Sequence, residues 1–265
     1  MTEQKRVITS IKSGIVAGTL MIALSFGMTP VYAQTPTTGT VSTTPGARAA
    51  ARLSANETRL KTRGDAEITR RITALNTLLT KLGAMKRLTD SQKATFTSGV
   101  QGEITTLTNL KAKIDADTDI ATLRTDVQSI VQSYRVFALY LPQINIMANA
   151  DKALAIVDEM NQISTKLQTR IDAAKGAGHD TTALVTLMTD RAAKLTDAST
   201  QANNAINTVV PLTPAGYPGN RPTLLSARTM LQTVHTDLTT AEKDATQIRQ
   251  TLKGWGTTVK PTPTP

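Results

Sequence analysis

Apolar residues recur along this chain at alternating steps of three and four, the spacing that keeps one face of an α-helix against a partner helix. Five helical segments are predicted from this pattern, at about 48–88, 90–114, 120–171, 180–209 and 222–256. No window shows the alternation of apolar and polar residues that a strand requires. The chain is therefore predicted to be all-α, an elongated antiparallel bundle of about five long helices with coiled-coil-like packing.

Helix-start and helix-stop residues support these boundaries. Thr89-Asp90-Ser91 is a start signal for the second segment, Asp180 for the fourth, and Asn220 with Pro222 for the fifth. The third segment has an unbroken inward pattern through Tyr134, Phe137, Leu141 and Ile144, but Pro142 falls inside it. Because proline removes a backbone donor and clashes with the preceding turn, a kink or short break is expected near Tyr140.

The first 33 residues predict export from the cytoplasm. Lys5, Arg6 and Lys12 precede an apolar stretch of about 13 residues, and Val31-Tyr32-Ala33 fits a cleavage site. An uncleaved anchor is the alternative, although the stretch is shorter than the roughly 20 residues that a spanning helix needs. The predicted organisation is a signal peptide at 1–33, a Thr/Pro-rich linker at 34–46, a helical bundle at 47–256 and a Thr/Pro-rich tail at 257–265.

Composition excludes several classes of site. The chain has no cysteine, so it has no disulfide, thiol nucleophile, Fe–S cluster or thiolate zinc site. It has two histidines, His179 and His235, which are far apart in sequence. No Gly-rich phosphate loop or H-E-x-x-H motif is present. We expect no catalytic residue, no metal site, no cofactor and no small-molecule substrate.

The charge is concentrated on the first predicted helix. Lysines and arginines number 30 against 20 acidic residues in the whole chain, but residues 47–88 contain ten basic and three acidic residues. At about 100° per residue, six of the basic residues fall within roughly 60° of arc, opposite the apolar face. They form a basic ridge, which we predict as a polyanion-binding surface: Arg48, Arg52, Arg59, Arg63, Arg70 and Lys81. The alternative is an ordinary solvated helix face.

Two further clusters have a functional and a structural interpretation. Asp115, Asp117, Asp119 and Asp126 have part of the spacing of a calcium loop, but Ile120 stands where that loop needs glycine, so helix capping is favoured. The aromatic residues around Pro142 are interpreted as core, with an interhelical pocket as the alternative; they are Tyr134, Phe137 and Tyr140, beside Arg135. The loop around Tyr217 is interpreted as a connector, with partner contact as its alternative.

Two segments carry a family resemblance. Residues 133–143 (SYRVFALYLPQ) and 212–220 (LTPAGYPGN) resemble segments of an uncharacterised family of exported all-helical bacterial proteins. The resemblance implies an all-helical protein of the cell envelope or the extracellular space. It implies no activity and transfers no catalytic residue.

These observations predict a secreted, non-enzymatic helical protein of the cell envelope that binds an anionic polymer or a protein partner. A periplasmic or extracellular chaperone or adhesin is an alternative, and a homo-oligomer is compatible with the apolar seams. A third hypothesis is an enzyme with an interhelical site near Pro142. For that site Asp126 and Asp151 are the nearest acids in sequence, and they would have to point into a pocket.

Overall fold

The computed structural model describes residues 44–256. Within that range it contains no strand, and the predicted all-α class is confirmed. The α-helices are α2 (Pro45–Gly83), α3 (Asp90–Ala116), α4 (Ile120–Gln132), α5 (Leu141–Gly176), α6 (Thr182–Val209) and α7 (Arg221–Gly256). A π-helical turn (Val136–Tyr140) precedes α5, and a 3₁₀ turn (Pro214–Gly216) lies between α6 and α7. The predicted signal peptide, residues 34–43 of the linker and the C-terminal tail lie outside the described residues.

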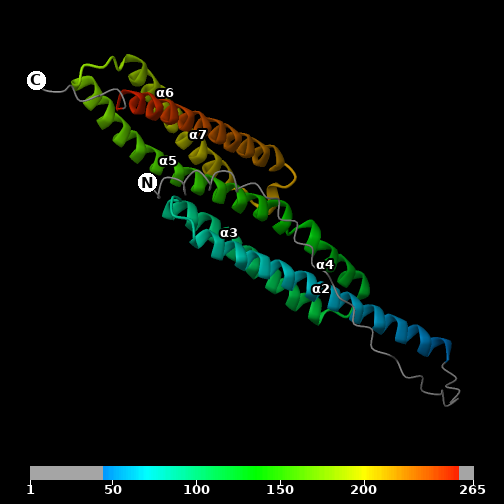
Figure 1. The fold of residues 1–265 in the computed structure, drawn as a ribbon. Helices are drawn as coiled ribbons and strands as arrows, with labels where there is room; N and C mark the ends of the chain where they lie inside the picture. The colour runs from blue at the N-terminus through cyan, green and yellow to red at the C-terminus, as the bar shows by residue number, and fades with distance from the viewer. Residues whose placement is uncertain (1–43, 257–265) are drawn as a thin grey trace, which may run out of the picture. The chain divides into compact units, whose positions relative to one another are not determined.

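The helices pack in two sets of three. Helix α2 packs against α3 and α4, while α5, α6 and α7 pack against one another (Figure 1). Helix α2 also contacts α5 and the π-helical turn, and these contacts join the two sets. A core of buried apolar side chains extends through both sets, and a second, smaller cluster around Leu167, Ile171, Ile248 and Leu252 closes the far end of α5, α6 and α7.

Local signals in the sequence account for several helix starts. Thr89 and Gln92 form a reciprocal capping box at the start of α3, because each side chain accepts a hydrogen bond from the other residue's backbone N–H, at 3.2 Å and 2.9 Å. The start signal predicted at Thr89 is therefore confirmed. The Asp180 side chain accepts a hydrogen bond from the Thr182 backbone N–H at 3.0 Å. It therefore caps the first residue of α6, although the N-cap position itself is Thr181.

Three predicted boundaries are wrong by a few residues. Helix α2 begins at Pro45, inside the predicted linker, because proline is well accommodated in the first turn of a helix. It ends at Gly83 rather than at residue 88, although Met85 and Leu88 are buried in the turn that follows. Apolar spacing alone does not distinguish buried turn residues from a continuing helix. Pro222 occupies the second position of α7 rather than the first.

The third predicted helix is two helices with a changed phase between them. The break lies at 133–135, earlier than Tyr140, and the π-helical turn follows it, with the Leu141 N–H donating to the Val136 carbonyl five residues earlier. A π-type turn has more residues per turn than an α-helix, so it rotates the residues that follow. Consequently Phe137 and Leu141, which were predicted to face inward, are 37% and 41% exposed. Val136, Leu139, Tyr140 and Gln143 are buried instead.

Candidate polyanion-binding surface

Among residues 44–256, no other helix packs against the first three turns of α2. Every residue from 44 to 55 is exposed, including Leu53, which retains 57% of its accessible surface. Burial on α2 begins at Gly64, where the helix meets α3 and α4. The N-terminal end of α2 accordingly extends past the helices that cover the rest of it (Figure 1). We call residues 45–60 the N-terminal arm of α2.

Gly64 sets how closely α2 approaches its neighbours. A Cβ atom at this position would lie 3.2 Å from Cγ2 of Val127 on α4 and 3.3 Å from Cδ1 of Ile114 on α3. Both distances are shorter than ordinary van der Waals contact between carbon atoms. Because Gly64 has no side chain, α2 can pack closely against α3 and α4 at this position, a few residues after the arm ends.

Four of the six predicted ridge residues lie on or next to the arm. Arg48, Arg52, Arg59 and Arg63 are all exposed. Within residues 44–256, neither Arg52 nor Arg63 makes a hydrogen bond or an ion pair, and Arg59 Nη2 donates only to the Asn56 side chain at 3.3 Å. The guanidinium groups of Arg52, Arg59 and Arg63 are therefore open to solvent and to an external anion.

The other two ridge residues have partners within the protein. Arg70 Nη2 is 2.7 Å from Glu67 Oε1, and its guanidinium carbon lies 4.6 Å from the centre of the Phe137 ring. Lys81 Nζ donates to Asn145 Oδ1 of α5 at 2.7 Å. Partial burial and the charge of Lys152 lower the pKa of Lys81. We restrict the candidate surface to the exposed arginines on and next to the arm, Arg48, Arg52, Arg59 and Arg63.

Part of the charge of α2 is neutralised inside the fold. Arg71 is buried and pairs with Glu67, and Lys61 lies 2.8 Å from Glu57. Arg87 Nε, in the turn after α2, is 3.0 Å from Asp158 Oδ2. The positive field available to a partner is therefore concentrated towards the N-terminal half of α2.

The aspartates of the predicted calcium-like segment do not converge. Asp119 caps α4 by accepting a hydrogen bond from the Thr122 backbone at 2.8 Å, which confirms the capping interpretation for this residue. Asp115 pairs with Lys111 and Asp126 with Lys113, both at 2.9 Å. Across residues 44–256, no group of three or more metal-ligating side chains could hold an ion.

The aromatic residues near Pro142 divide between core and surface. Tyr140 packs edge-on against Phe96 with ring centres 5.9 Å apart, and its hydroxyl donates to the Gly99 carbonyl at 3.2 Å. Phe137 is on the surface beneath Arg70. The core interpretation is thus confirmed for Tyr140 and wrong for Phe137, because the π-helical turn rotates the face on which Phe137 lies.

Glu103 is the acid that lies near this cluster, and sequence reasoning missed it. It is on α3, its charge raises the pKa of Tyr134 and of Tyr140, and its Oε1 atom is buried without a hydrogen-bond partner among the described residues. Burial raises the pKa of Glu103 to about 7. Asp126 and Asp151, the acids considered for an enzyme site, instead accept hydrogen bonds from Lys113 and from the backbone N–H of Arg87.

The remaining sequence candidates have structural contacts. The His179 ring stacks on Trp255 with centres 4.7 Å apart, which joins the turn after α5 to the end of α7. His235 is exposed on α7. The guanidinium carbon of Arg135 lies 4.9 Å from the centre of the Tyr217 ring. The loop between α6 and α7 therefore packs against the break before α5.

Arg191 of α6 was not predicted, and it is the largest fully buried side chain of the described chain. Its Nη2 donates to the Met160 carbonyl of α5 at 2.8 Å, its Nε to Ser164 Oγ at 2.9 Å, and its Nη1 to the Ala241 carbonyl of α7. The guanidinium therefore joins three helices through neutral acceptors. Its signal was available, since Arg191 occupies the seam position between Met188 and Leu195.

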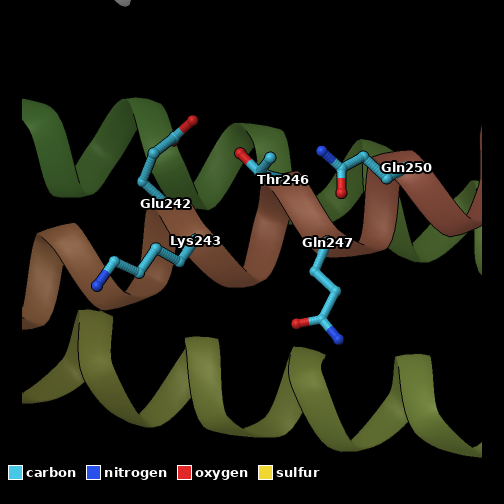
Figure 2. Close-up of a pocket in the computed structure, with 5 residues that line it drawn as sticks. All are labelled: Glu242, Lys243, Thr246, Gln247 and Gln250. Atoms are coloured by element: carbon cyan, nitrogen blue, oxygen red, sulfur yellow. The ribbon is translucent and has the colours of Figure 1, made fainter.

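A shallow depression on α7 offers no converging groups. Its lining residues all come from one helix: Glu242, Lys243, Thr246, Gln247 and Gln250. Figure 2 shows Glu242, Thr246 and Gln250 on one side of α7 and Lys243 and Gln247 on the other. These side chains point apart, so the depression lacks the convergent polar groups of a small-molecule site.

Comparison with known proteins found no matching family model, no similar curated protein and no similar solved structure. Among residues 44–256, no helix is long and apolar enough to cross a membrane.

Proposed function

We propose that this protein is an exported, non-enzymatic binding protein of the cell envelope that holds an anionic polymer on the basic ridge of α2. Export is supported by the basic and apolar pattern of the first 33 residues and by the resemblance of segments 133–143 and 212–220 to exported bacterial proteins. Binding is supported by one structural observation above all: four exposed arginines share one face of a helix whose end no other described element covers.

The chemistry of these residues suits a polyanion. Guanidinium groups stay charged at any physiological pH and bind phosphate or carboxylate in a bidentate fashion. Residues 45–63 contain five basic residues, Arg48, Arg52, Arg59, Lys61 and Arg63, and one acid, Glu57, a net charge of +4. A linear polyanion lying along this face would contact only positively charged side chains.

Co-sedimentation of the purified protein with isolated cell envelopes over a salt series tests the proposal. Four phosphate contacts predict that log K falls with log salt with a slope of about −3. Replacing Arg48, Arg52, Arg59 and Arg63 by Gln should abolish this binding. A matched control replaces four exposed basic residues of α5 and α7 by Gln: Lys166, Arg170, Lys175 and Arg228.

The control separates local from general electrostatics, because both variants lose four positive charges. Equal loss of binding in the two variants would show that net charge, not the ridge, attracts the protein to the envelope. If the unaltered protein stays in the supernatant at low salt, the polyanion proposal fails and the chaperone or adhesin alternative should be pursued with protein partners.

A further inference from the structure

Helices α3 and α4 both lie alongside α2 where its N-terminal arm ends (Figure 1). A Cβ atom at Gly64 would lie 3.2 Å from Val127 Cγ2 on α4 and 3.3 Å from Ile114 Cδ1 on α3. Gly64 therefore faces the boundary between its two neighbours. The side chains on either side of it show which flank of α2 borders α3 and which borders α4.

Ion pairs and hydrogen bonds mark the α3 flank. Lys61 Nζ donates to the Asp115 carbonyl oxygen at 3.0 Å, and Asp65 Oδ1 is 2.7 Å from Lys111 Nζ. At about 100° per residue, Lys61 and Asp65 each lie about 160° around α2 from Arg63. Arg63 is therefore on the flank of α2 that points away from α3.

Arg70 shows what borders that flank. It follows Arg63 by seven residues, so the two lie about 20° apart around α2. The Arg70 guanidinium carbon is 4.6 Å from the centre of the Phe137 ring, in the π-helical turn that follows α4. The ridge side of α2 thus borders α4 and the turn after it.

Arg124 lies on the matching side of α4. Asp126 marks the side of α4 towards α3, because its Oδ1 is 2.9 Å from Lys113 Nζ, and Val127 marks the side towards α2. At about 100° per residue, Arg124 is about 60° beyond Val127 in the direction away from Asp126. It is exposed and, within residues 44–256, makes no hydrogen bond or ion pair.

Arg63 and Arg124 are also at nearly the same height. Helices α2 and α4 run in the same direction, since each is antiparallel to α3. Arg63 precedes Gly64 by one residue and Arg124 precedes Val127 by three, a difference of about 3 Å along the axes. Packed helices are about 8–10 Å apart, so these two long side chains can reach one ligand segment. Arg59, one turn before Arg63 on the same face, is a third.

The acids nearest in sequence to the arginines of α2 do not neutralise this group. Glu57 is 2.8 Å from Lys61, and Glu67 pairs with Arg70 and with the buried Arg71. Three exposed guanidinium groups from two helices consequently share one side of the junction between α2 and α4.

We infer that Arg59, Arg63 and Arg124 together hold one segment of the polyanion at the junction of α2 and α4, so that two helices bind the polymer rather than one. This inference rests on the proposed function and adds to it a binding residue outside α2. The junction is well suited to this role because the packing of Gly64 against Val127 fixes the two helices before binding. Residues 44–55 are all exposed, and a helix without tertiary packing is only marginally stable, so contacts confined to the arm would carry a larger ordering cost.

Calorimetric titration of the full chain with long-chain inorganic polyphosphate, used as a soluble polyanion, over a salt series tests the inference. Arg124→Gln should bind about tenfold more weakly, as expected for the loss of one charged hydrogen-bonding group. The slope of log K against log salt should become less steep by about 0.7. The matched control is Arg170→Gln, which removes one exposed, unpaired arginine from α5 and should keep the affinity within about twofold.

A double-mutant cycle tests whether the arginines of the two helices hold the same segment. The loss in Arg63→Gln with Arg124→Gln should be at least about threefold smaller than the product of the two single losses, because each arginine supports the other's contact. Arg52 lies about 14 Å from Arg124 along the helix axes, so the losses of Arg52→Gln and Arg124→Gln should simply multiply.

Two results would overturn the inference while leaving binding through α2 intact. One is an affinity of Arg124→Gln no lower than that of Arg170→Gln, and the other is strictly multiplicative losses for Arg63 and Arg124. If the unaltered protein binds no polyphosphate at low salt, the proposed function and this inference both fail.

Discussion

The guanidinium of Arg191 on α6 donates from Nη2 to the main-chain carbonyl oxygen of Met160 on α5, at 2.8 Å. Within residues 44–256, its hydrogen-bond acceptors are two carbonyl oxygens and one hydroxyl, and none is a carboxylate. Burial lowers the pKa of this arginine, although the charges of Glu242 and Asp244 oppose that effect. A charge held mainly by neutral acceptors is stable only while all of its donors are satisfied. Arg191 therefore makes the packing of α5, α6 and α7 specific rather than simply apolar.

Arg191→Ala should lower the free energy of unfolding by about 3–5 kcal/mol, because it leaves a cavity and removes the donors to the Met160 and Ala241 carbonyls. Urea unfolding followed by circular dichroism measures this. Arg170→Ala, an exposed change on α5, should alter stability by less than about 0.5 kcal/mol. Equal midpoints for the two variants would contradict the role of Arg191.

A second prediction concerns the carboxyl groups of Asp190 on α6 and Asp244 on α7. Burial and the adjacent Asp190 raise the pKa of Asp244 above its ordinary value of 3.8, against the opposing charges of Arg191 and Lys194. The folded state therefore holds this proton more tightly than the unfolded state does. The stability that depends on it is complete below pH 3.8 and is lost as the pH rises through the folded-state pKa.

Asp244→Asn should consequently stabilise the protein at pH 7 and have little effect near pH 3, since it replaces a carboxylate by a neutral group of the same shape. Thermal unfolding at the two pH values measures the difference. Asp172→Asn, at an exposed site on α5, is the control. A loss of stability at pH 7 would show that the Asp244 carboxylate is needed for its charge.

Helix periodicity is enough to place most of the core and the arginine face. Ile68, Leu75, Phe96, Leu107 and Ile206 are all buried, as the alternation of three and four predicts. Arg48, Arg52, Arg59 and Arg63 are exposed on the opposite side of α2, because a side chain's face on a regular helix depends only on its position in the sequence. These features are local, and local patterns predict them.

The features that sequence reasoning missed depend on contacts between distant segments. Phe137 is exposed because the break at 133–135 and the π-helical turn change the phase that Pro142 alone suggested. The spacing within α2 contains the Arg70–Glu67 pair, which is three residues apart. It does not contain the contacts of Arg70 with Phe137 and of Lys81 with Asn145, because Phe137 and Asn145 are distant in sequence.

The carboxyl group of Glu103 gives a third prediction. Its pKa is raised from 4.5 to about 7, so stability is lost as the pH rises between these values. The full shift corresponds to about 3 kcal/mol, and partial solvent exposure reduces the expected effect to about 1–2 kcal/mol. Glu103→Gln should therefore raise the free energy of unfolding at pH 8 by this amount.

Chemical unfolding of Glu103→Gln at pH 4 and at pH 8 provides the test. At pH 4, below both pKa values, most of the wild-type carboxyl is protonated in both states, so the two proteins should have nearly equal stability. Glu159→Gln, at an exposed position on α5, controls for the loss of one negative charge. The same gain in both variants at pH 8 would attribute the effect to net charge rather than to the burial of Glu103.

The last prediction separates the effect of where an arginine lies on α2 from the effect of the net charge of the helix. Ala50 is exposed and lies about 160° around the helix from Arg52 at about 100° per residue. The double variant Arg52→Ala with Ala50→Arg keeps composition and net charge but moves one guanidinium off the ridge. Long polyphosphate, used as a soluble polyanion, should bind it about as weakly as it binds Arg52→Ala alone, because the displaced arginine no longer lies on the face that contacts the polymer. Titration at two salt concentrations measures this. Wild-type affinity in the double variant would mean that the arm attracts polyanions through its total charge, and the ordered ridge would then have no part in recognition.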